Sequence, residues 1–356
     1  MQTSDISPAP PSAQSRTLRT PQDLASEGLI AEADISVLST VAERYATAIP
    51  PAFAQLISAP DDPIGLQVIP AAEELITSES ELTDPIGDDA LSPIPGIVHR
   101  YPDRALLKPI LICPLYCRFC FRREHVGPEG GLLTEAQLSA AIEWVEQHPA
   151  IREIILTGGD PLMLSPRRLR DLLARLERIP HITTLRIHTR VPVAAPEKIT
   201  ADMLDALTTE KPLWMAIHAN HAREFSADAR KAINALRKRG IPLLGQSVLL
   251  RGVNDTTEAL ENLFRTMVET FIKPYYLHQL DPAPGTSRFA VPITEGQDLL
   301  RSLRGRITGL AWPTYVLDIP GGHGKVPLSP EYLDSVAGTV KDPSGQTHTV
   351  TGITPS

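Results

Sequence analysis

The chain has 356 residues, of which 42% are hydrophobic, and its formal net charge is −8. A chain of this length can bury a large core, and its negative charge argues against a nucleic-acid partner and favours a small-molecule substrate. We expect a cytoplasmic protein, because the sequence contains neither an apolar run of about 18 residues nor an N-terminal secretory signal.

The N-terminal quarter of the chain predicts a tail followed by a helical extension. Residues 1–20 are rich in Pro and Ser, which predicts a disordered tail. Residues 21–95 contain short apolar stretches separated by loops such as APDDPIG and SPIPG, and this pattern predicts short helices.

Beyond residue 95, apolar β-branched runs alternate with amphipathic segments. The predicted strands cover residues 105–112, 153–159, 184–190, 212–220, 242–250, 273–281 and 313–320. Such alternation predicts a parallel sheet, and the number of units exceeds a small doubly wound domain but falls short of eight. We therefore predict a partial (β/α) barrel over 96–325, followed by a short C-terminal extension over 326–356.

The segments between the strands carry helix-capping residues. Thr134 and Gln137 can form a capping box, and Ser165 stands before a proline that suits a first helical turn. Ser226 begins a further amphipathic segment that ends at Gly240. These signals support helices between the predicted strands.

Polar residues gather at the carboxyl ends of the predicted strands. They are Gly158-Gly159-Asp160, His188-Thr189-Arg190, His218, Asn220, Asp281 and Asp318, with Gln246 inside the fifth strand. The catalytic residues of (β/α) barrels lie at this end of the strands. One strand-end histidine would usually be structural, but so many polar residues at one rim predict a large active site.

All three cysteines of the chain, Cys113, Cys117 and Cys120, lie within the stretch CPLYCRFC after the first predicted barrel strand. An odd number of cysteines fits a disulfide framework badly, and soft thiolates select zinc or iron–sulfur clusters. Structural zinc normally takes four protein ligands. Three thiolates on a four-iron cluster would leave one iron open to a substrate or cofactor. The alternative is a buried turn that merely contains small thiols.

The stretch DIPGGHGK (318–325) is a second glycine-rich motif. It does not match a phosphate-binding P-loop, because Ile319 and Val326 stand where that motif requires Gly and Ser or Thr. A glycine loop that presents Lys325 also suits covalent attachment of an aldehyde cofactor. The alternative is a solvated loop lysine.

With these motifs in order, the chain resembles the lysine 2,3-aminomutase family of the radical S-adenosylmethionine (SAM) superfamily, and in particular its compact members. Some compact members make β-lysine for elongation factor P. The resemblance covers about residues 60–330 and rests on DPIGLQVIPAAEEL, SPIPGIVHRYPDRALL, the cysteine motif, LTGGDPL, RVPV, HANH, GQSVLLRGVND, LHQLDPAPGTSRF and DIPGGHGK. The zinc-binding cysteines at the C-terminus of the longest members are absent here.

The resemblance implies three cofactors: a [4Fe-4S] cluster on the three cysteines, SAM, and pyridoxal 5′-phosphate (PLP). Lys325 matches the lysine that binds PLP covalently, and Arg104 matches an arginine that contacts the PLP phosphate. His218 and Gln246 match residues that line the SAM site. The residues that match the glycine-rich SAM motif are Gly158, Gly159 and Asp160.

The resemblance also implies L-lysine as substrate, whose 2-amino group would move to C3. Arg122 matches the arginine that pairs with the substrate carboxylate, and Asp281 and Asp318 match the two aspartates that hold the ε-ammonium. Two neighbouring carboxylates need a cation between them, which the lysine ammonium supplies. Arginine or ornithine would satisfy the charge but not the reach equally well.

Two other interpretations are a radical SAM/PLP aminomutase for another amino acid and a radical SAM enzyme without PLP. A non-enzymatic electron-transfer or iron-sensing module is a third, but it would need neither the aspartates nor the glycine–lysine loop. We expect an electron donor such as flavodoxin or ferredoxin. The oligomeric state stays open, with a homodimer as one option.

Overall fold

The computed structural model describes residues 16–349. The predicted tail over 1–20 falls largely outside this range, but its last residues are ordered. Leu18, within the predicted tail, is fully buried and forms a β-bridge with Ile49. In the described part of the chain, no helix is both long and apolar enough to cross a lipid bilayer.

A nine-stranded sheet forms the centre of the molecule, and its strands neighbour one another in chain order. Strands β2 to β8 are parallel and correspond to the seven predicted strands, whereas β1 and β9 pair antiparallel at the two edges. The strands are β1 (Ile97–Tyr101), β2 (Arg104–Ile110), β3 (Glu153–Gly158), β4 (Thr184–Thr189), β5 (Leu213–His218), β6 (Leu243–Val248), β7 (Ile272–His278), β8 (Thr314–Asp318) and β9 (Lys325–Pro327). This arrangement confirms the predicted partial barrel.

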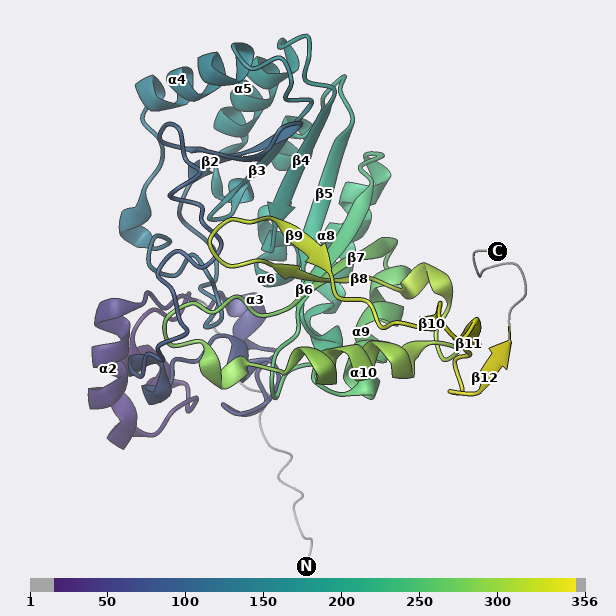
Figure 1. Cartoon of the computed structure of the whole chain (residues 1–356). Coiled ribbons are helices and arrows are strands. Elements are labelled where there is room, and N and C mark those ends of the chain that lie inside the picture. Colours follow the sequence, from purple (N-terminus) through teal and green to yellow (C-terminus); the bar gives the residue numbers. More distant parts are fainter. Residues whose placement is uncertain (1–15, 350–356) are drawn as a thin grey trace, which may run out of the picture.

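Helices connect the parallel strands and cover one face of the sheet (Figure 1). They are α4 (Glu135–Glu146), α5 (Pro166–Glu177), α6 (Val191–Ala194), α7 (Ala201–Ala206), α8 (Ala227–Lys238), α9 (Thr257–Glu269) and α10 (Ile293–Leu303). Alternate strand residues such as Leu156 and Leu185 are buried in the core that contains the helix residues Leu173 and Leu236. The intervening strand residues therefore face the inside of the barrel.

The predicted helix caps are present. The Thr134 hydroxyl accepts a hydrogen bond from the Gln137 amide, and the Gln137 side chain accepts one from the Thr134 amide. The Ser165 and Ser226 hydroxyls likewise accept from the third amide of their helices. Local sequence therefore sets where α4, α5 and α8 begin.

The N-terminal region consists of short helices that lie at one end of the sheet (Figure 1). These are α1 (Pro21–Ser26), α2 (Ile35–Arg44), α3 (Pro51–Ala54) and short 3₁₀ turns, among them η3 (Ala72–Leu75). Their apolar residues Leu24 and Phe53 form a core cluster that also contains Leu115 of the cysteine motif. The extension thus packs directly against the predicted site.

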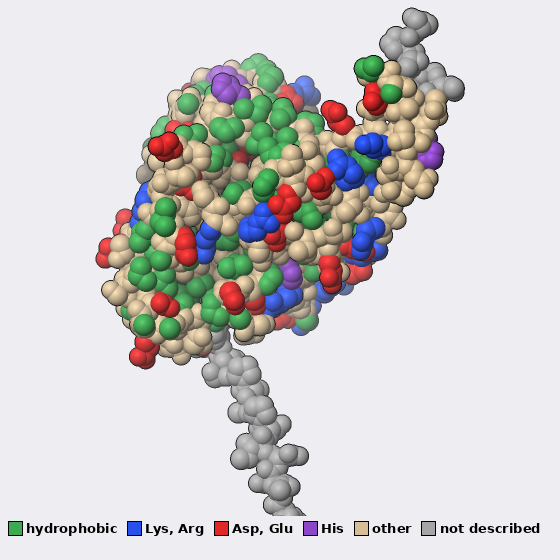
Figure 2. All heavy atoms as spheres, turned by 60° about the horizontal axis from the view of Figure 1, so that its bottom comes forward, with side chains coloured by type: hydrophobic (Ala, Val, Ile, Leu, Met, Phe, Trp, Pro, Cys, Tyr) green, Lys and Arg blue, Asp and Glu red, His purple; other side chains and the backbone are tan. Residues whose placement is uncertain are grey.

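The predicted boundary between barrel and C-terminal extension, at residues 325 and 326, falls inside β9. Beyond it, a small antiparallel sheet contains β10 (Leu333–Asp334), β11 (Thr339–Lys341) and β12 (Thr347–Thr349). On the face shown in Figure 2, basic and acidic side chains are interspersed among apolar ones.

Candidate active site

The glycines after β3 lie against the strand that leads to the cysteines. Gly158 has φ of +108°, and a side chain there would approach the Ile110 carbonyl oxygen to 2.8 Å. At Gly159 a side chain would approach the Ile112 backbone to 2.5 Å. Because Gly158 and Gly159 have no side chains, the end of β3 can pack closely against the end of β2. The same feature would let a ligand approach the backbone there.

Asp160 follows the two glycines, and its carboxylate is bonded within the protein. It accepts hydrogen bonds from the Thr189 hydroxyl at 2.8 Å and from the backbone amides of Leu162, Arg190 and Val191. Burial raises the pKa of this carboxyl group. Asp160 thus ties the end of β3 to the end of β4, and we propose that its part in cofactor binding is to fix this loop.

The cysteine loop, defined as residues 113–123, carries the three partly buried thiols into one hollow beneath it. Burial raises the pKa of the Cys113 and Cys120 thiols, the latter to about 11. The Arg190 guanidinium donates a hydrogen bond to the Cys117 sulfur at 2.7 Å. The Arg190 hydrogen bond suits a thiolate ligand at Cys117, whereas the buried Cys113 and Cys120 would need a bound metal to hold them as thiolates.

In residues 16–349, no three His, Cys, Asp or Glu side chains are arranged to hold a single metal ion. The three thiols nevertheless fit an iron–sulfur cluster, because its ligands sit at separate corners of a cube and do not converge on one ion.

Buried ion pairs from the N-terminal region brace the cysteine loop. Glu74 is fully buried in η3, and its carboxylate accepts hydrogen bonds from Arg118 at 3.0 Å and from Arg123. Arg288 approaches the same carboxylate to 3.5 Å. Burial alone would raise the pKa of Glu74, but Arg118 and the other arginines hold it below its usual value. The Gln67 carbonyl also accepts from the Arg118 amide at 2.8 Å.

Inside the barrel, His188, His218 and Gln246 point away from the helical layer, and the last two are register partners on β5 and β6. The Nε2 atoms of both histidines are buried and have no hydrogen-bond partner among the described residues. Burial lowers the pKa of both histidines well below its ordinary value, so they are neutral. Such unpaired polar atoms mark where a bound ligand would supply partners.

Lys325 lies at the start of β9, directly opposite Asp318 at the end of β8. Its ammonium forms an ion pair with the Asp318 carboxylate and lies 3.3 Å from His278 Nδ1. His278 Nδ1 is also 3.5 Å from the same carboxylate. Burial would raise the pKa of Asp318, but His278 and Lys325 lower it strongly.

The second predicted aspartate, Asp281, has the opposite character. Its Oδ1 is buried and has no hydrogen-bond partner among the described residues. Burial, and then the neighbouring Asp318, raise the pKa of Asp281 to about 7. The pair of aspartates thus has one carboxylate satisfied by a protein cation and one that lacks a cation.

Arg104 lies at the opposite end of the barrel from the cysteines, at the start of β2. Its guanidinium stacks over the Tyr101 ring at 3.8 Å and pairs with Asp103. The Tyr101 hydroxyl accepts a hydrogen bond from the Lys325 amide at 2.7 Å. Tyr101 therefore contacts both Arg104 and Lys325, which suits one ligand that reaches between them.

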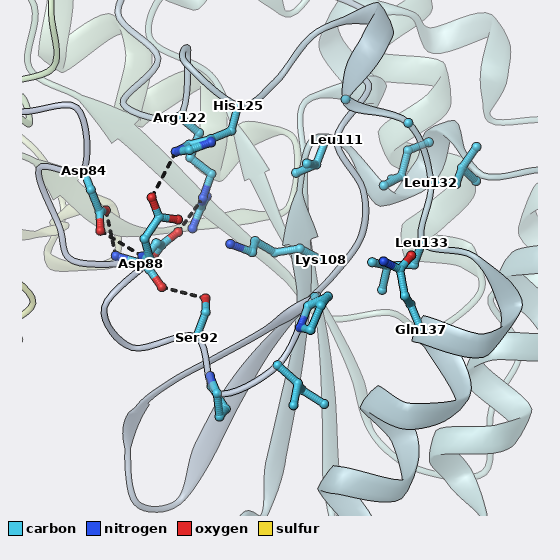
Figure 3. A pocket seen from close by; sticks show the side chains of 18 of the residues that line it. Asp84, Asp88, Ser92, Lys108, Leu111, Arg122, His125, Leu132, Leu133 and Gln137 are labelled. Atoms are coloured by element: carbon cyan, nitrogen blue, oxygen red, sulfur yellow. Dashed lines mark hydrogen bonds and ion pairs between the residues drawn. The ribbon is translucent and has the colours of Figure 1, made fainter.

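Arg122 lines a cavity of about 660 Å³ beside the open edge of the barrel (Figure 3). Its Nε donates to the buried Asp88 carboxylate at 2.8 Å. Arg100 lies 3.4 Å from Asp88 and 3.5 Å from Asp318, and so links the two ends of the site. The terminal nitrogens of Arg122 have no hydrogen-bond partner among the described residues, which leaves them available to a carboxylate.

Sequence reasoning missed several of these residues, namely Glu74, Asp88, Arg100, Lys108 and His278. Their partners lie far away in the sequence, so spacing alone carries no signal for most of them. Two signals were available. Arg100 lies on the motif that contains Arg104, and His278 lies on the motif that contains Asp281.

Comparisons with known proteins identify the family of this chain. A model of the radical SAM superfamily matches residues 107–265, and a lysine-2,3-aminomutase model matches residues 300–340. The chain is 37% identical over 320 residues to L-lysine 2,3-aminomutase of Fusobacterium nucleatum, which covers 89% of this chain and 75% of that protein.

It is 39% identical over 290 residues to L-lysine 2,3-aminomutase of Acetoanaerobium sticklandii, and the match covers 81% of this chain and 70% of that protein. It is 34% identical over 300 residues to glutamate 2,3-aminomutase of Clostridioides difficile, and the match covers 84% of this chain and 71% of that protein.

Proposed function

We propose that this chain, which belongs to the lysine 2,3-aminomutase family of the radical SAM superfamily, moves the 2-amino group of L-lysine to C3 and so makes β-lysine. It is an isomerase of the radical SAM class, with a [4Fe-4S] cluster and SAM as cofactors. What we propose beyond this class is that the substrate is lysine and that PLP is the third cofactor.

The observation that carries the proposal is the distribution of charge across the site. Arg122 offers an unpaired guanidinium edge at one end, and Asp281 offers an unpaired carboxylate oxygen at the other. Free L-lysine carries an α-carboxylate for the first group and an ε-ammonium for the second. Arg100 and Asp88 span the distance between these ends.

The aspartates favour lysine over glutamate. The side chain of glutamate would bring a third carboxylate toward Asp281 and Asp318, and like charges in a buried site repel strongly. An ammonium between the two carboxylates would instead return Asp281 to its charged form. The similarity to a glutamate 2,3-aminomutase therefore does not extend, in our proposal, to the substrate.

Lys325 and Arg104 would hold PLP, with Tyr101 between them. When bound, PLP supplies a double bond through which an amino group can migrate, and SAM supplies the carbon radical that starts the reaction. The protein's own groups then bind and orient the substrate. Asp318 holds the Lys325 ammonium, and His278 lies close enough to take its proton. We propose flavodoxin or ferredoxin as the electron donor.

The test is to incubate anaerobically reconstituted, reduced protein with SAM, PLP and each of L-lysine, L-glutamate and L-arginine, and to identify β-amino acids. We expect β-lysine only. Product from glutamate but not from lysine would refute the substrate assignment. Borohydride reduction followed by peptide mass spectrometry tests PLP use, and we expect the adduct on Lys325 in the native chain and none in Lys325→Met.

A further inference from the structure

Lys108 is a half-buried cation inside the barrel that the proposed function leaves unexplained. It lies in the middle of β2 and points into the cavity beside Arg122 (Figure 3). Among the described residues it forms neither a hydrogen bond nor a direct ion pair, although the charges of Asp88, Asp89 and Asp84 act on it from a greater distance. Burial lowers the pKa of its ammonium group. A partly desolvated cation without a partner is costly, which indicates that a ligand supplies one.

The carboxylates that line the same cavity already have partners. Asp88 binds Arg122 and Arg100, and Asp89 lies 3.4 Å from the His125 ring. Asp84 accepts backbone hydrogen bonds from Asp88 at 2.7 Å and from Asp89 at 2.8 Å. Each acid of this wall thus has a nearer partner than Lys108, whose ammonium faces the cavity and feels these carboxylates only from a distance.

We propose that Lys108 is a second cation for the substrate carboxylate, so that the α-carboxylate binds between the Lys108 ammonium and the terminal nitrogens of Arg122. Asp88 orients the Arg122 side chain through its Nε and leaves the outer edge free. An ammonium adds donors that are not confined to the guanidinium plane. This inference rests on the proposed function and adds a residue that discriminates amino acids from amines.

Two other anions are candidates for Lys108, and both are outcomes of the test. The PLP phosphate would lie near Arg104, which is four residues earlier on the same face of β2 and therefore about 13 Å away. The SAM carboxylate would lie nearer the cysteine loop. The cavity shared with Arg122 favours the substrate over both cofactors.

The test compares L-lysine with 1,5-diaminopentane, which is lysine without its carboxylate. Affinities are measured by calorimetry on the oxidised holoenzyme, in which no turnover occurs, for the native chain, Lys108→Met, Lys108→Arg and the exposed control Lys231→Met. We expect Lys108→Met to weaken L-lysine about tenfold or more and to leave diaminopentane unchanged. Lys108→Arg should recover part of the loss, and Lys231→Met should lose nothing.

Equal weakening of both ligands, or of neither, would overturn the inference. A loss of PLP adduct or of SAM cleavage with unchanged lysine affinity would overturn it too, and would assign Lys108 to a cofactor. L-Glutamate in the same series separates this inference from the proposed substrate. If the native chain binds glutamate but not lysine, and Lys108→Met weakens glutamate, the carboxylate role stands and the lysine assignment falls.

Discussion

The cysteine loop is held by buried charges, whereas the glycine-rich loop over 318–325 is held mainly by close backbone contacts. Glu74 binds Arg118 and Arg123 beneath the first loop. In the second loop, the Gly321 amide donates to the Pro85 carbonyl at 3.1 Å, and Gly322 lies against Gly87. Both sets of contacts come from the N-terminal region, which is therefore part of the site and not an appendage to the barrel.

Removal of the Glu74 charge has the largest expected effect, and it tests whether buried charge holds the cysteine loop in place. In Glu74→Gln, three arginines lose their shared buried carboxylate, and loss of one partner from a buried ion pair costs about 3–5 kcal/mol. We expect the variant to bind less than half as much iron and sulfide per chain after reconstitution. The measurement is iron and sulfide analysis together with the cluster's visible absorbance.

The matched control is Glu73→Gln, which neutralises the exposed neighbour of Glu74 and should keep a full cluster. Circular dichroism of both variants separates local loss of the loop from general unfolding. A Glu74→Gln protein that folds and holds as much cluster as the control would show that buried charge does not set the loop.

A side chain at Gly87 should damage the other loop. In Gly87→Ala, the added Cβ would lie 2.7 Å from Gly322 Cα and 2.9 Å from the Gly321 carbonyl carbon, and φ at this residue is +71°. Backbone atoms cannot rotate aside, so we expect a cost of about 2–4 kcal/mol and displacement of the loop that carries Lys325. The yellow absorbance of the Lys325–PLP adduct should fall severalfold, while iron content stays normal.

Gly28→Ala is the control for backbone strain alone. Its φ is also +71°, but a side chain there meets no atom within 4 Å. We expect it to lose about 1 kcal/mol of stability and none of its PLP adduct. Equal adduct in Gly87→Ala and Gly28→Ala would mean that the contact with residues 321 and 322 does not position Lys325.

The same contrast explains how much the sequence could predict. Strands β2 to β8 were predicted because their apolar runs are local, and Asp281, Asp318 and Lys325 were predicted because they follow strand ends or lie on a family motif. The edge strand β9 has only three residues, and β1 (IVHRY) has only two buried residues, so neither carries the apolar run of a central strand. Glu74 lies 44 residues from Arg118, so only the folded chain reveals what it binds.

A change of pH should affect the two regions differently. Asp281 ionises near neutral pH, whereas the Glu74 carboxylate beneath the cysteine loop has a lowered pKa and stays charged. The raised pKa of Asp281, about 7, means that the folded protein binds this proton more tightly than the unfolded chain. The free energy of unfolding should therefore fall as pH rises from about 4 to about 7. We expect the Asp281 contribution to this fall to be on the order of 2 kcal/mol, because the side chain is partly accessible and solvent screens its interactions.

The measurement is urea unfolding of the native chain and Asp281→Asn, without substrate, at pH 5 and pH 8. The asparagine removes the titration, so the variant should gain stability relative to the native chain at the higher pH. Lysine affinity of the native chain should improve over the same interval as the carboxylate forms. Parallel stability profiles of the two proteins would rule out a titrating Asp281.

The smallest effect concerns the charges beside Lys325. Burial, and then the Lys325 charge, lower the pKa of His278, so the ring is neutral, and in the tautomer whose Nδ1 carries no proton it can accept the Lys325 proton at 3.3 Å. The Asp318 carboxylate opposes this proton transfer, because its ion pair with Lys325 stabilises the Lys325 ammonium. We expect His278→Phe to slow PLP attachment about fivefold at neutral pH and His278→Gln to slow it less, because glutamine retains an acceptor.

Attachment is followed by the growth of the yellow adduct in stopped-flow experiments from pH 6 to 9. If His278 accepts the proton, the native rate should depend on pH through the ionisation of the His278 ring, and this dependence should be lost in His278→Phe, where only solvent removes the proton. A uniform slowing with an unchanged pH profile would contradict proton acceptance by His278. Backbone contacts with residues 85–87 would then be enough to account for how Lys325 is presented.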